Sequence, residues 1–199
     1  FEQPVDILEA VSFYNYQNYA RANNFVIGGT SLARGNPNAD GITTELDAGK
    51  FNVLESYTEI AVFPFSFPTR FFTDVAVNVS NAAAGFGSGG DVTGSTALEE
   101  SGAYSFGLKL GNMAKKGDME ASWAFKHIAA NSVVGAFADS DFGDGHAGKH
   151  GNQFKLGYAL TDTLFINSSA SFVENLNSGT AGIIDQQQRR FQMDLVWKF

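Results

Sequence analysis

The sequence predicts an all-β protein of the antiparallel transmembrane β-barrel class, and three features support this prediction. Apolar and polar residues alternate with a period of two in most extended segments, as they do in strands that separate lipid from water. The connections between these segments alternate between short and long, as periplasmic turns and extracellular loops do. No segment keeps the period of an amphipathic helix.

The C-terminal segment shows this alternation most clearly. Phe191, Met193, Leu195, Trp197 and Phe199 share one face, and the opposite face is polar except for one valine. An apolar face flanked by aromatic residues is typical of a barrel strand. Trp197 and the terminal Phe199 also resemble the assembly signal of bacterial outer-membrane barrels, whose last strand ends in Phe. An edge strand of a soluble sheet could show the same alternation.

Nine strands are expected, separated by turns and by loops rich in Gly, Pro, Asn and Asp. They are Ile7–Asn18, Phe25–Leu32, Phe51–Phe63, Arg70–Ser80, Tyr104–Gly111, Asp118–Lys126, Gln153–Leu160, Leu164–Phe172 and Gln188–Phe199. If the last strand runs towards the periplasm, the first of nine does so too. Single-chain bacterial barrels have an even number of strands with both ends in the periplasm. We therefore expect residues 1–199 to form one barrel domain that is incomplete at its N-terminus, as the C-terminal portion of a larger even-stranded barrel.

Composition narrows the functional classes further. The chain has 199 residues, 14% of them aromatic and 17% charged, and it contains no cysteine. No run reaches the 18 or more apolar residues of a spanning helix, which leaves barrel strands as the expected membrane element. The net charge of −8 argues against a nucleic-acid partner, because no basic stripe is present. The first residue is Phe rather than Met, so a processed or truncated product is expected.

Charged residues recur on the predicted polar face of the strands, where they would line a water-filled pore. This face combines both signs and is slightly basic. We expect the pore-lining set to be Arg70, Asp74, Lys109, Glu120, Lys126, Lys155, Arg190, Asp194 and Lys198. Small residues on the same face would leave room for water, namely Gly107, Ala124, Gly157, Ala159 and Ser169.

Several segments resemble the putative porins of bacterial outer membranes. They include RFFTDVAVN at residues 70–78, GLKLGN at 107–112 and LGYALTD at 156–162. The loop sequence VGAFADSDFG at 134–143 and the ending DLVWKF complete the resemblance, which covers about the last two thirds of the chain. The resemblance implies an outer-membrane channel with more of the barrel upstream.

The long loops carry the chain's negative excess. They contain 11 acids against two bases, Arg34 and Lys149. The acids are Asp40, Glu45, Asp47, Asp91, Glu99, Glu100, Asp139, Asp141, Asp144, Glu174 and Asp185. One hypothesis is an acidic outer vestibule that concentrates cations. The alternative is that these acids only keep the outer surface soluble.

Residues 139–150 contain two weaker candidate sites. Asp139, Asp141 and Asp144 resemble part of a calcium loop, but the required glycine and the final acid are missing. His146 lies in the same Gly-rich loop, and with Asp139 and Asp141 it could form a protease-like site only if the three converged. We expect no enzyme activity and no cofactor.

The function that the sequence favours is a passive diffusion channel for small hydrophilic solutes or ions in the bacterial outer membrane. The expected partners are outer-membrane lipid, the barrel-assembly machinery, and a second copy or an associated outer-membrane protein. The alternative is a non-conducting barrel that anchors or docks another protein. Small residues on the polar face favour the channel, whereas a filled interior would favour the anchor.

Overall fold

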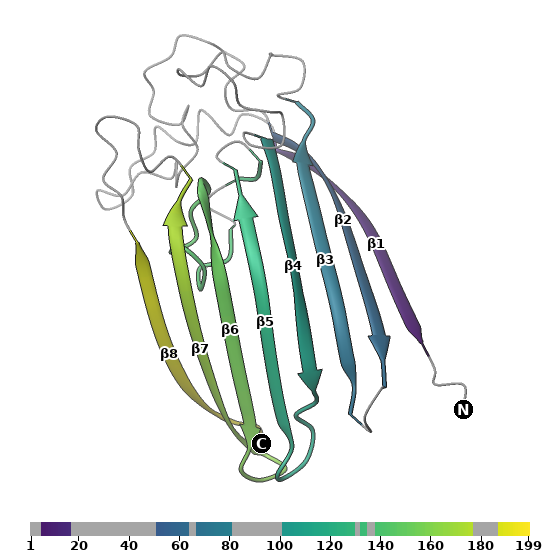
Figure 1. The fold of residues 1–199 in the computed structure, drawn as a ribbon, viewed down its shortest axis with the longest axis vertical. Helices are drawn as coiled ribbons and strands as arrows, with labels where there is room; N and C mark the ends of the chain where they lie inside the picture. The colour runs from purple at the N-terminus through teal and green to yellow at the C-terminus, as the bar shows by residue number, and fades with distance from the viewer. Residues whose placement is uncertain are drawn as a thin grey trace.

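The protein is a curved antiparallel sheet of eight strands in the part of the chain that the structure describes (Figure 1). The computed structural model describes residues 5–16, 51–63, 67–80, 101–129, 132–134, 138–176 and 187–199. The strands are β1 (Asp6–Tyr16), β2 (Phe51–Val62), β3 (Thr69–Asn78), β4 (Gly102–Gly111), β5 (Met119–Ile128), β6 (Lys149–Ala159), β7 (Leu164–Asn175) and β8 (Gln188–Trp197). The all-β antiparallel prediction is confirmed. No helix among these residues is long and apolar enough to span a membrane.

Each strand pairs with its neighbours in sequence, in the order β1 to β8. The β2–β3, β4–β5 and β6–β7 connections are short and lie at the end of the sheet that also holds the C-terminus, and longer connections lie at the opposite end (Figure 1). The expected sorting of connections by length is therefore present among the described strands. No ladder joins β1 to β8 among these residues, so the sheet is open along those two edges.

The N-terminal strands differ from the prediction. The expected strand Phe25–Leu32 lies outside the described residues. β1 instead pairs with β2 along its whole length, from Asp6 opposite Ala61 to Tyr16 opposite Phe51. No strand lies between them, and β1 runs in the opposite direction to that expected. The count of nine strands and the parity argument built on it are therefore not supported by the eight described strands.

Two strands extend three or four residues beyond the predicted limits. β6 begins at Lys149 rather than Gln153, and β7 continues to Asn175 rather than ending at Phe172. The added residues pair with one another, with Lys149 opposite Asn175 and Gly151 opposite Val173. Ladder formation with two neighbouring strands overrides the loop-like composition of this stretch.

The apolar face of the sheet is exposed. Phe106 is 44% exposed, Leu156 59% and Trp197 70%, so these three side chains are not buried together in a core. Aromatic rings instead form edge-to-face pairs across the strands, with centroids 6.2 Å apart for Phe154 and Phe172 and 5.9 Å for Phe172 and Phe191. Exposed apolar surface on this scale marks an interaction with lipid or another apolar partner.

The buried apolar side chains of the strands lie on the opposite, polar face. One cluster contains Phe51, Val53, Ala76 and Ala103 of β2–β4 together with Val134, which packs onto them from the connection between β5 and β6. The core is therefore formed between the polar face and a connection that folds back onto it.

The glycines of the β4–β5 turn allow a stability prediction. Gly111 and Gly117 both have positive φ, at 79° and 89°. A Cβ at Gly111 would lie 2.2 Å from the Met119 carbonyl oxygen, whereas a Cβ at Gly117 would meet nothing within 4 Å. Both Ala substitutions strain the backbone by roughly 1–2 kcal/mol. Gly111→Ala should cost about 1–3 kcal/mol more, because the backbone must also shift.

Urea unfolding of the two variants in the same lipid would measure this difference. Gly117→Ala is the matched control for the backbone strain. Equal unfolding midpoints for the two variants would contradict the close approach at Gly111.

Candidate functional site

The polar face brings the expected pore-lining residues onto one surface. Strand pairing places Arg70 opposite Lys109, and it aligns Asp74 with Ser105 and then with Lys126 across three strands. The same alternation continues through β6, β7 and β8. The face carries Arg70, Asp74, Lys109, Glu120, Lys126, Lys155, Arg190 and Asp194, and Lys198 lies directly after β8.

β2 adds two carboxylates that the sequence reasoning missed. Glu55 and Glu59 lie on the polar face. Their register partners Ala76 and Phe72 each lie two residues from Asp74 and therefore share its face. Glu59 pairs with Arg70 at 3.5 Å, and the Tyr14 hydroxyl donates to Glu55 at 2.8 Å. The sequence pattern did not identify these two carboxylates, because both faces of β2 mix polar and apolar residues.

A segment of the β5–β6 connection, residues 138–148, lies on this face. Lys126 Nζ contacts Asp139 Oδ2 at 2.6 Å and lies 5.3 Å from the centroid of the Phe142 ring. Phe142 is fully buried. The segment is therefore held against β5 by an ion pair and by a buried aromatic ring.

Arg190 of β8 holds the other side of the segment. Its Nη1 donates to the Ser140 carbonyl oxygen at 2.8 Å. The guanidinium also lies 3.5 Å from Asp141 Oδ1 and 3.8 Å from Asp144 Oδ1. The segment is thus attached to the wall from β5 to β8, and Figure 1 shows it beside β6 and β7.

Local turns give the segment its shape. The Phe142 amide donates to the Asp139 carbonyl at 3.0 Å, and the Asp141 amide donates to the Asp139 side chain at 2.9 Å. Gly143, Asp144 and Gly145 follow with φ between 56° and 68°. This left-handed region suits glycine and is tolerated by Asp. The backbone therefore reverses here and directs both Asp141 and Asp144 towards Arg190.

Asp139 remains ionised at the wall. Burial alone would raise the pKa of Asp139, but the hydrogen bond and positive charge of Lys126 outweigh burial. The Asp141 amide acts in the same direction, and the pKa lies below its ordinary value of 3.8. The Lys126–Asp139 contact is consequently an ion pair across the neutral pH range.

We expect acid to weaken this attachment. Because the pKa of Asp139 is lowered in the folded state, the ion pair stabilises the segment fully above about pH 4 and is lost as the pH falls through the lowered value. Pepsin cleavage near Phe142 should therefore accelerate as the pH falls below that limit. Asp139→Asn should be cleaved rapidly at every acidic pH, and the ratio of wild-type to variant rates removes the protease's own pH dependence. A constant ratio would contradict the prediction.

The small residues of the polar face have different surroundings. A Cβ at Gly107 would lie 2.5 Å from the Phe72 ring, and one at Gly157 would lie 2.8 Å from Met113 Sδ. Ala124 and Ala159 are buried, at 8% and 0% exposure. Gly107 and Gly157 thus have the larger side chains of Phe72 and Met113 beside them. Gly157 and Ser169 also line a cavity, as expected for positions that leave room for water.

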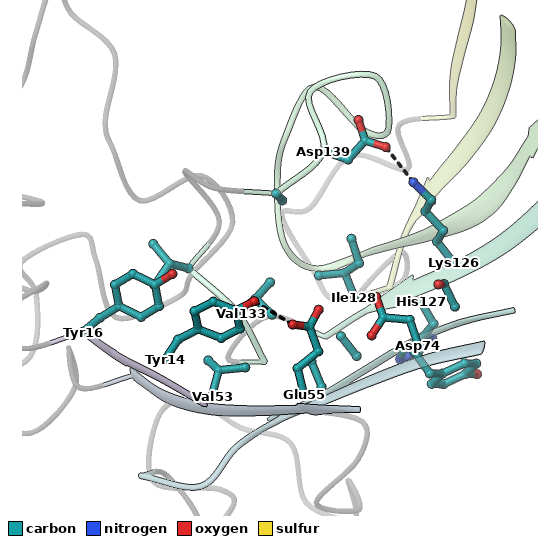
Figure 2. Close-up of a pocket in the computed structure, with 16 residues that line it drawn as sticks. Tyr14, Tyr16, Val53, Glu55, Asp74, Lys126, His127, Ile128, Val133 and Asp139 are labelled. Atoms are coloured by element: carbon teal, nitrogen blue, oxygen red, sulfur yellow. Dashed lines mark hydrogen bonds and ion pairs between the residues drawn. The ribbon is translucent and has the colours of Figure 1, made fainter. Parts of the chain in front are cut away.

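Described residues of the polar face line a larger and a smaller cavity. The larger, of about 410 Å³, lies between β1–β5 and the folded-back connection and includes Tyr14, Glu55, Asp74 and Lys126 (Figure 2). The smaller, of about 230 Å³, lies over β5–β8 and is lined by charged and polar residues. Its lining includes Glu120, Asp141, Lys155, Ser169 and Asp194. The surface therefore retains polar space beside the segment 138–148.

The geometry changes the interpretation of the loop acids. Asp139, Asp141 and Asp144 face Lys126 and Arg190, so two positive charges of the wall offset part of their negative charge. The acidic vestibule stays a prediction. Glu174 Oε2 lies 3.9 Å from His150 Nε2. The other acids of the vestibule hypothesis lie outside the described residues.

The metal and protease alternatives are not assembled in the described part of the chain. No three His, Cys, Asp or Glu side chains gather there in a way that could hold a metal ion. The three aspartates of the calcium-like loop instead face cations. His146 contacts the Gly143 carbonyl oxygen at 3.2 Å, and among the described residues it makes no hydrogen bond or ion pair with Asp139 or Asp141.

The end of the chain lies at the short-connection end of the sheet. Trp197 is opposite Leu164 on the apolar face, and Phe199 is fully exposed. The Lys198 amide donates to the Thr163 carbonyl at 2.8 Å. The assembly role of Trp197 and Phe199 stays a prediction.

Comparison with known proteins identifies one family. A family model described as "Putative porin" matches residues 20–199. No curated protein matches the sequence, and no solved structure matches the fold.

Proposed function

Because the chain belongs to the putative porin family, we propose that it forms part of the wall of an outer-membrane channel for passive diffusion of small hydrophilic solutes or ions. In this proposal the apolar face contacts lipid and the polar face contacts water. The barrel-assembly machinery and further copies of the protein are the proposed partners. Family membership indicates a channel or structural protein rather than an enzyme.

The observation that carries the proposal is the division of one sheet into two chemically opposite faces. Large apolar residues are exposed on one face, as in Met193 at 76% and Phe191 at 73%. The other face carries charges of both signs and a segment attached across it. A wall between lipid and water gives both faces a favourable solvent.

The open edges of β1 and β8 support the further proposal that more strands complete the barrel. Each edge presents backbone donors and acceptors that need partners within a membrane. A barrel that includes these residues together with additional chain would pair them.

Liposome swelling with the full-length protein tests the channel. Vesicles containing the protein should swell in small sugars and swell progressively more slowly as the sugar becomes larger. Vesicles containing heat-denatured protein are the control. Absence of swelling in every sugar, together with absence of ion conductance in planar bilayers, would contradict the channel.

A non-conducting anchor is the second candidate, and one observation favours it. The Phe72 ring occupies the space above Gly107 that was expected to hold water. The same swelling experiment separates the candidates, because an anchor would insert into vesicles without making them permeable.

A further inference from the structure

The larger cavity has two chemically different sides. Val53, Ala76, Ala103 and Val134 contribute buried apolar surface. The other side carries charged and phenolic groups, and Figure 2 shows the carboxylates of Glu55 and Asp74 pointing from the sheet into the cavity. Its volume of about 410 Å³ lies within the usual range of roughly 300–1,000 Å³ for small-molecule sites.

The charge of the lining is negative. Glu55, Asp74 and Asp139 line the cavity with a single Lys, Lys126, among its described residues. Lys126 contacts Asp139 at 2.6 Å, on the far side of the cavity from β2 (Figure 2). Glu55 and Asp74 are therefore left with an excess of negative charge between them.

Asp74 is the less satisfied of the two carboxyl groups. Its Oδ1 is buried and has no hydrogen-bond partner among the described residues. A buried carboxylate oxygen without a donor is costly. Glu55 accepts a hydrogen bond from the neutral Tyr14 hydroxyl at 2.8 Å, and its carboxyl group also lies within hydrogen-bond reach of the Asp74 carboxyl group. A cationic hydrogen-bond donor beside this pair would satisfy Asp74 Oδ1 and offset the negative charge.

The remaining lining distinguishes the kind of cation. The Tyr14 and Tyr16 rings border the cavity, stacked with centroids 6.4 Å apart. Aromatic faces and apolar side chains favour an organic ammonium group over a strongly hydrated metal ion. The described residues also contain no cluster that could hold a metal.

We infer that this cavity is a binding subsite for a small organic ammonium ion with an apolar body. The ammonium group contacts Glu55 and Asp74, and the apolar body lies against Val53, Val134 and the tyrosine rings. This inference rests on the proposed channel, since it makes the cavity a subsite on the diffusion path.

Calorimetric titration of the full-length protein in detergent tests the subsite without requiring conductance. The probe is phenethylammonium, and its neutral and anionic analogues of similar size are 2-phenylethanol and phenylacetate. Phenethylammonium should bind at least tenfold more tightly than either analogue. Equal binding of 2-phenylethanol would overturn the inference, because the carboxylates would then contribute nothing.

Charge-neutral variants test the two carboxylates. Glu55→Gln and Asp74→Asn keep the shape of the side chains, and each should weaken phenethylammonium binding about tenfold. Asp162→Asn removes a charge from the exposed β6–β7 turn and should leave the affinity unchanged. Unchanged affinity in both carboxylate variants would overturn the assignment, and the analogue comparison on the wild-type protein decides the case where a variant does not fold.

Conductance separates this inference from the channel proposal. Phenethylammonium should reduce single-channel current at concentrations near its calorimetric dissociation constant, and phenylacetate should not. Selective binding without any conductance would keep the subsite and overturn the channel. Conductance without selective binding would keep the channel and overturn the subsite.

Discussion

Replacing Met193 with Arg is expected to destabilise the protein in lipid by about 2–4 kcal/mol. Met193 lies in the middle of β8 on the apolar face and is 76% exposed. A charge at this depth must leave water for hydrocarbon if the face contacts lipid. If the sheet were instead part of a water-soluble body, Arg at such an exposed position would change stability by less than about 0.5 kcal/mol.

Gln192→Arg is the matched control, because Gln192 is the adjacent residue and lies on the polar face. Its Nε2 donates to Asp194 at 2.9 and 3.2 Å, and a guanidinium could make similar contacts. Urea unfolding in vesicles of one lipid composition would measure both variants. A cost for Met193→Arg no larger than that for Gln192→Arg would contradict the assignment of the two faces.

The alternation of the C-terminal strands was predictable because each side chain meets one of two different solvents. In β8, Phe191 and Met193 lie on the apolar face while Arg190 and Gln192 lie on the polar face. The sequence keeps a period of two where one face of a strand must be apolar and the other must be polar. The prediction was accurate where this contrast is strong.

β2 shows where that reasoning fails. Its polar face carries Phe51 and Val53, which pack in the buried cluster, beside Glu55 and Glu59, which do not. Part of the polar face is covered by the folded-back connection, so buried apolar residues and charges occur on the same side. Periodicity alone could not show that Glu55 and Glu59 belong to the candidate site.

The attachment of residues 138–148 depends on contacts that are distant in sequence. Asp139 meets Lys126, and Ser140, Asp141 and Asp144 meet Arg190, which lies about 50 residues further along the chain. No local pattern encodes such pairings. The one available signal was the surplus of cations on the wall strands opposite a loop rich in acids.

Arg190→Ala is expected to release the segment 138–148 from the wall. The substitution removes a charged hydrogen bond to the Ser140 carbonyl and two ion pairs of 3.5 and 3.8 Å. The Arg190 side chain is 39% exposed, so solvent screening reduces the ion-pair contribution. A total of about 2 kcal/mol is reasonable, which would raise the released population roughly 30-fold.

Single-channel recording of the full-length protein is the measurement that detects this release. Because the segment lies over the polar face, its departure should widen the path and add a second, larger conductance level. Arg189→Ala is the matched control, since Arg189 is the adjacent residue on the opposite face, paired with Phe172, and its removal leaves the attachment intact. Asp141→Asn with Asp144→Asn should produce part of the same effect, because the Ser140 carbonyl contact remains. Identical conductance histograms for Arg190→Ala and Arg189→Ala, both folded, would show that the segment does not control the path.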